Sequence, residues 1–100
     1  MSGRLRHLLV TYDVGTATAA GEKRLRRVAQ FCCAHGVRVQ KSVFECVLEP
    51  SDVTVLLEKL LKVIDAKKDT IRIYHLGGTM PRVERFGKEG PITTKDVMIV

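Results

Sequence analysis

The chain has 100 residues, of which 45% are hydrophobic and 28% charged, and this composition is typical of one globular domain. No apolar run approaches the length of a membrane span, and the first apolar run is too short for the core of a signal peptide. We therefore expect a cytoplasmic protein without a membrane partner. The three cysteines lack the spacing of a metal finger, so we expect reduced, mostly buried thiols.

The net charge of +6 is confined to the first part of the chain. Residues 1–41 contain eight Lys and Arg against two acidic residues, whereas residues 42–100 contain nine of each sign. A charge surplus in one part of a fold favours a polyanionic partner. A solvated basic helix face is the alternative interpretation.

The first predicted strand runs from Arg6 to Asp13 and is a short apolar run rich in β-forming residues. It ends on an aromatic residue and a single carboxylate, directly before the turn at Gly15. Because ligand sites in open α/β sheets gather at the carboxyl ends of strands, Asp13 is a candidate functional residue. The alternative is that Asp13 only begins the turn into the next helix.

The next segment predicts an amphipathic helix that has Thr18 as its N-cap and ends before Gly36. Its apolar positions recur at spacings of three and four: Leu25, Val28, Ala29 and Cys32. The opposite face is almost purely cationic and contains Lys23, Arg26, Arg27 and Gln30, with Arg24 at its edge. Few surface helices are so one-sided, because mixed signs would add favourable pairs.

Two strands are predicted at residues 37–40 and 42–48, which form either a tight hairpin or one bent strand. A second helix with Ser51 as its N-cap follows, and then a strand over residues 70–76. This β-α-β-β-α-β order predicts an α+β fold, a ferredoxin-like sandwich in which two helices cover one face of a four-stranded antiparallel sheet. The other face of the sheet is then exposed to solvent, bound to nucleic acid or buried in a dimer.

The predicted ferredoxin-like domain covers residues 1–78, and residues 79–100 form a C-terminal tail. The tail has a β-like piece at Arg82–Phe86 and an apolar end at Val97–Val100. A short extra strand of this kind often adds to a sheet edge, here that of a dimer partner or another protein.

The sequence offers little catalytic chemistry, since it has no phosphate-binding glycine loop, no paired-cysteine metal site and no Ser/His/Asp constellation. A single Asp13 supplies too few ligands for Mg²⁺, because phosphoryl-transfer sites usually need two or more oxygen ligands. A two-fold axis beside Asp13 would bring a second copy of this carboxylate into the same cleft. A symmetric Mg²⁺-dependent nuclease is therefore conceivable.

Four blocks of the sequence resemble the CRISPR-associated protein 2 family: residues 11–14, 23–28, 36–45 and 69–74. The block Val-Gln-Lys-Ser-Val-Phe-Glu, within the third of these, is fairly specific to the family. The resemblance implies a ferredoxin-like homodimer that works in CRISPR spacer acquisition, lies along duplex DNA and bridges two dimers of a CRISPR-associated integrase. Members have also been described as metal-dependent endonucleases on RNA or DNA.

The family's functional positions correspond here to Asp13, Tyr12, Arg27, Arg38 and Phe44. A further helix arginine of some members corresponds to Leu25, so this chain departs from the family pattern there. Together with the cationic helix, the expected nucleic-acid contacts are Tyr12, Lys23, Arg26, Arg27, Arg38 and Phe44.

Two functions of different classes follow. The first is a dimeric scaffold that holds duplex DNA by its phosphates and bridges integrase dimers. The second is an endonuclease in which Asp13 of both protomers is the catalytic residue and holds Mg²⁺. A ferredoxin-like regulator or toxin-type protein is a third interpretation, which fits the sequence blocks less well. The cationic helix and the scarcity of catalytic groups favour the scaffold.

Overall fold

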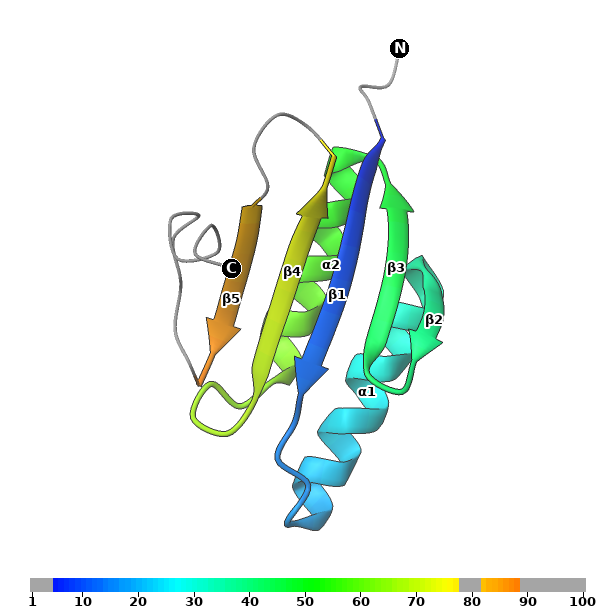
Figure 1. Cartoon of the computed structure of the whole chain (residues 1–100). Coiled ribbons are helices and arrows are strands. Elements are labelled where there is room, and N and C mark those ends of the chain that lie inside the picture. Colours follow the sequence, from blue (N-terminus) through cyan, green and yellow to red (C-terminus); the bar gives the residue numbers. More distant parts are fainter. Residues whose placement is uncertain (1–4, 78–81, 89–100) are drawn as a thin grey trace.

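The computed structural model describes residues 5–77 and 82–88. Its elements in chain order are β1 (Arg6–Asp13), α1 (Ala19–His35), β2 (Val37–Gln40), β3 (Val43–Leu48), α2 (Pro50–Val63), β4 (Thr70–Leu76) and β5 (Arg82–Gly87). The strands form one antiparallel sheet in the order β2-β3-β1-β4-β5, and both helices lie against one of its faces (Figure 1). The predicted α+β, ferredoxin-like fold with an additional strand is thus confirmed.

The central strand β1 pairs with both β3 and β4. Every second residue of β1 points into the layer between the sheet and the helices. These residues are Leu8, Val10 and Tyr12, and all three are buried. They pack with residues from every neighbouring element, including Phe44, Val28, Leu56 and Ile71. Thr11 and Asp13 consequently lie on the other face of the sheet, which the helices leave open.

The two helices begin for different physical reasons. Thr18 caps α1, since its hydroxyl accepts a hydrogen bond of 3.1 Å from the Gly21 N–H, as predicted. The predicted N-cap Ser51 of α2 is wrong. This helix begins at Pro50, and its cap position, Glu49, is two residues earlier than predicted and makes no side-chain cap bond. Proline favours the first helical position because its φ is already helical and it has no N–H to satisfy there.

The sequence left two arrangements open for the strands after α1, and the structure has the tight hairpin. β2 and β3 pair antiparallel across a turn at Lys41 and Ser42, with a register shift between Arg38 and Gln40. β2 is the edge strand of the sheet and lies beside α1 (Figure 1). All four of its residues are exposed.

The part of the tail that is described forms β5, which pairs along β4 of the same chain from Arg82 opposite His75 to Gly87 opposite Thr70. The predicted apolar end at Val97–Val100 lies outside the described residues. Cys32 and Cys46 are buried and Cys33 is exposed, and all three are free thiols. No helix within residues 5–77 and 82–88 is long and apolar enough to cross a membrane.

Candidate nucleic-acid interface

Asp13 lies exposed at the carboxyl end of β1, on the open face of the sheet. A shallow hollow at this place is lined by Thr11, Tyr12, Asp13, Thr70 and Arg72. The strand register brings them together, because Thr70 lies opposite Asp13 and Arg72 lies opposite Thr11. The lining residues whose side chains lie on the open face thus supply the Asp13 carboxylate, the Arg72 guanidinium and the hydroxyl groups of Thr11 and Thr70, which are groups that bind cations and phosphates.

The described residues offer few metal ligands in this hollow. Within the described part of the chain, no group of three or more His, Cys, Asp or Glu side chains could hold a metal ion. Of the residues that line the hollow, Asp13 alone has a carboxylate. Mg²⁺ in phosphoryl-transfer sites is held by one or two carboxylates together with waters and substrate phosphates. A second copy of the chain placed beside Asp13 would add a further carboxylate.

Tyr12 of β1 and Phe44 of β3 form a stacked aromatic pair, with ring centroids 6.0 Å apart. The Arg38 guanidinium lies 5.1 Å from the Phe44 centroid, and the Tyr12 hydroxyl donates to the Lys41 carbonyl oxygen at 3.4 Å. Burial raises the pKa of Tyr12, although a hydrogen bond with Arg38 opposes this effect. The phenol therefore stays neutral and helps to hold Arg38 in place.

The structure places Phe44 differently from the other predicted contacts. Its side chain has no exposed surface and lies in the core, so within this chain it acts on a ligand only through Tyr12 and Arg38. Arg38 itself is exposed on the edge strand β2. The alternation of β3 already put Phe44 and Cys46 on one face, and the structure identifies that face as the buried one.

The predicted cationic face of α1 is present. Lys23, Arg26 and Arg27 are exposed, and none of them forms an ion pair within the described part of the chain. α1 lies beside β2, which carries Arg38 (Figure 1). The structure therefore places Arg38 on the strand next to the helix that carries the other three cations, whereas Asp13 lies at the end of β1, on the open sheet face.

Arg24, at the edge of this face, is turned toward the protein. Its Nε donates to Asp69 Oδ2 at 2.8 Å, and Asp69 has no exposed surface. Asp69 also accepts from the backbone N–H groups of Gly15 and Asp65, at 3.0 and 2.8 Å. Burial alone would raise the pKa of Asp69, but the hydrogen bonds from Arg24, Asp65 and Gly15 lower it below the usual range.

This buried ion pair fixes the loop that follows Asp13. Gly15 belongs to that loop, and it also lies against the first turn of α1, where a Cβ on Gly21 would collide with the Gly15 carbonyl oxygen. Sequence reasoning missed the role of Asp69, as well as the place of Arg72 in the hollow. Both depend on contacts between segments far apart in the chain.

Comparison with known proteins identifies the family. A family model described as "CRISPR associated protein Cas2" matches residues 6–81. The chain belongs to the Cas2 family. The resemblance of the four sequence blocks is thereby confirmed.

Several Cas2 proteins are similar over most of their length. The chain is 44% identical over 93 residues to the CRISPR-associated endonuclease Cas2 of Halalkalibacterium halodurans, covering 92% of this chain and 97% of the relative. It is 46% identical over 94 residues to the CRISPR-associated endoribonuclease Cas2 of Chlorobaculum tepidum, covering 93% and 98%. The crystal structure of Streptococcus pyogenes Cas2 matches with a TM-score of 0.67 and 52% sequence identity, over 71% of this chain and 86% of that one.

Proposed function

We propose that this Cas2-family chain works in the cytoplasm as a homodimer in CRISPR spacer acquisition, where it binds duplex DNA by its phosphates and bridges dimers of the integrase. The observation that carries the proposal is the set of exposed cations on α1 and β2 that form no ion pair with another described residue: Lys23, Arg26, Arg27 and Arg38. Cations that are not neutralised by the protein are free to neutralise phosphates and release counterions.

The mode of binding follows from the residue types. Long cationic side chains on one helix and one edge strand contact phosphates and position the duplex, but they carry no base-reading pattern. Tyr12 and Phe44 support Arg38 from within the protein, through the stack and the hydrogen bond described above. The proposal therefore predicts affinity that depends on salt and not on base sequence.

The open sheet face supports the homodimer. Val37, Val47 and Leu76 lie on this face by register and are 67%, 46% and 45% exposed in the single chain. Exposed apolar side chains of this size on one side of a sheet are expected to be covered by another protein surface. A second copy placed there would also bring two Asp13 residues toward one two-fold axis.

The test of the scaffold uses two duplex DNAs of equal length and unrelated sequence, titrated at several salt concentrations. We expect equal affinities for the two duplexes and a steep, linear fall of log affinity with log salt. Adding the integrase should give a complex with integrase dimers bound to the Cas2-family dimer, measured by mass. A strong preference for one duplex, or affinity that does not change with salt, would contradict the proposal.

A second function is favoured by a separate observation, the exposed Asp13 beside Arg72 in the hollow. Relatives of this chain are named endonuclease and endoribonuclease. In this proposal Asp13 of both protomers holds Mg²⁺, which would supply Lewis-acid chemistry at a phosphodiester, and Arg72 orients the phosphate by its charge. Cleavage of labelled RNA or duplex DNA that requires Mg²⁺ and is lost in Asp13→Ala would support it. Equal cleavage by both proteins would exclude Asp13 as the catalytic residue.

A further inference from the structure

An aromatic ring with two cations beside it lies between the two helices, and only one of the two cations, Arg27, is among the predicted contacts. Phe31 of α1 is half-buried and packs against the core. The Arg27 guanidinium lies 5.9 Å from the centroid of this ring, and the Lys59 ammonium lies 5.7 Å from it. Arg27 reaches the ring from the preceding turn of the same helix, whereas Lys59 comes from α2.

Both cations lie beside one aromatic ring, 5.9 and 5.7 Å from its centroid. The ring attracts both, because the face of an aromatic ring is electrostatically negative. Arg27 and Lys59 are exposed, and neither forms an ion pair within residues 5–77 and 82–88. A polyanion that contacts both side chains would neutralise their charges, and attraction to the ring restrains the two side chains that would bind it.

This pair of cations also continues the cationic face of α1. Lys23, Arg27 and Phe31 are spaced by four residues, so they form one row along the helix. Lys59 extends this row of charge from α1 onto α2. An extended row of cations of this kind fits a linear polyanion better than a single small anion, which would bind in a closed pocket.

We propose that Arg27, Phe31 and Lys59 form a phosphate-binding seam that carries the backbone of duplex DNA from α1 onto α2. This inference rests on the proposed DNA-binding function and adds two residues to its binding surface, Lys59 as a direct phosphate contact and Phe31 as a positioning residue. Arg27 then acts together with a residue of the second helix, which the sequence alone does not connect to it.

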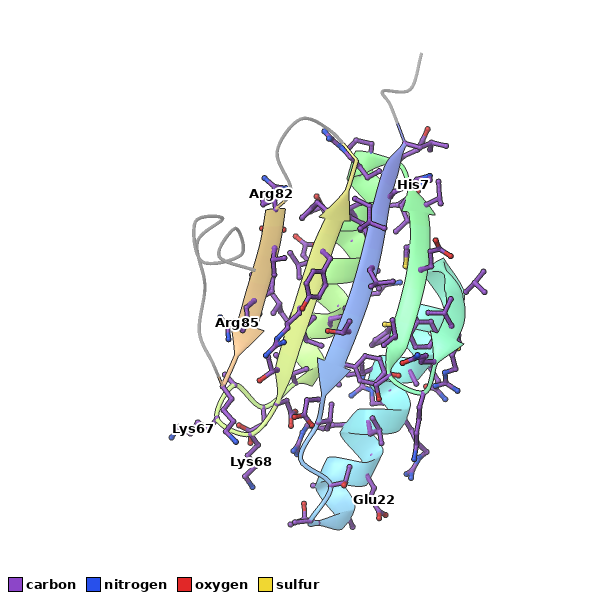
Figure 2. The ribbon with its side chains drawn as sticks, in the orientation of Figure 1. His7, Glu22, Lys67, Lys68, Arg82 and Arg85 are labelled. Atoms are coloured by element: carbon purple, nitrogen blue, oxygen red, sulfur yellow. The ribbon has the colours of Figure 1, made fainter. Side chains whose placement is uncertain are left out.

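The experiment measures the affinity of the full chain for one duplex DNA, by fluorescence anisotropy, at several salt concentrations. Each phosphate contact contributes about 0.9 to the slope of log affinity against log salt. We expect Lys59→Gln and Arg27→Gln each to lower the slope by about one and to weaken binding several-fold at low salt. Lys67→Gln is the matched control, because Lys67 is an exposed lysine in the α2–β4 loop, on the side of the sheet away from β2 (Figure 2).

Phe31→Leu measures the contribution of the aromatic ring to DNA affinity separately from that of the two charges. This variant keeps an apolar side chain at a partly buried position but removes the π face, so we expect several-fold weaker binding with both charges still present. A thermal melt confirms that the variant is folded. Affinity equal to that of the wild type would overturn the positioning role of Phe31.

The outcomes separate this inference from the function on which it rests. If Arg27→Gln lowers the slope while Lys59→Gln behaves like Lys67→Gln, the seam is overturned and DNA binding by α1 stands. If the wild type itself shows no salt dependence, the proposed DNA binding fails and the seam fails with it. A lower slope in both Arg27→Gln and Lys59→Gln, with no change in the control, supports the seam.

Discussion

Asp69 and Arg24 are separated by 45 residues, and they form a two-point ion pair in which the carboxylate accepts from Nε at 2.8 Å and from Nη2 at 3.3 Å. The Asp69 side chain is completely buried, and 16% of the Arg24 side chain is exposed. Since Asp69 also holds the Gly15 N–H, the pair joins α1, the loop after β1 and the loop before β4. It therefore fixes the cationic helix relative to Asp13.

Asp69→Asn is expected to lower the free energy of unfolding by about 3 kcal/mol, because the change leaves the Arg24 charge partly buried without a counterion. Urea denaturation of the wild type and the variant measures this loss. Glu22→Gln, at an exposed position in the first turn of α1 (Figure 2), is the control and should change stability by less than about 0.5 kcal/mol. Equal stability of Asp69→Asn and the wild type would mean that the pair does not fix the loop.

The same pair predicts a pH dependence of stability. The pKa of Asp69 is lowered in the folded protein, so its contribution is fully present above the unfolded pKa of about 3.9 and is lost as the pH falls through the folded pKa. The stability difference between wild type and Asp69→Asn should remain constant from pH 7 to about pH 4 and shrink below that. A difference that instead shrinks between pH 7 and pH 5 would show that another group is responsible.

Phe44→Ala should destabilise the fold by about 3–5 kcal/mol, since it removes a fully buried ring from the core. The milder Phe44→Leu should remain folded and keep the salt slope of DNA binding, because Phe44 does not reach a ligand directly. Thermal melts and salt titrations measure the two effects. A slope in Phe44→Leu that falls as far as in Arg27→Gln would show that the core position is linked to a phosphate contact.

Gly21→Ala tests the close approach of α1 to the loop after β1. Alanine in a helix interior normally adds up to about 1 kcal/mol of stability relative to glycine. Here the added Cβ would collide with the Gly15 carbonyl oxygen, so we expect a net loss. A higher melting temperature in the variant would mean that the loop moves away at little cost.

Much of the fold follows from local patterns in the sequence. The alternation of Leu8, Val10 and Tyr12 predicts the buried face of β1, and the Thr18 cap predicts the start of α1. The start of α2 was misplaced because Ser51 is a good cap residue in isolation, whereas the preceding Pro50 is better placed at the first helical position.

The site was less predictable, because its decisive contacts are not local. Nothing in the spacing of Arg24 and Asp69 joins them, and Arg72 enters the hollow only through the register of β4 against β1. Lys59 gains its neighbour Phe31 only when α2 packs beside α1. The exposed cations of α1, by contrast, follow from one helical period and were predicted.

The central claim is that the cations of α1 and β2 bind DNA phosphates. The most direct measurement compares the salt dependence of duplex binding by the wild type with that of one variant in which Lys23, Arg26, Arg27 and Arg38 are all glutamine. We predict a steep slope of log affinity against log salt for the wild type. The slope should be lower by about 3–4 in the folded variant, at about 0.9 for each lost phosphate contact. Equal slopes for the two proteins would contradict it.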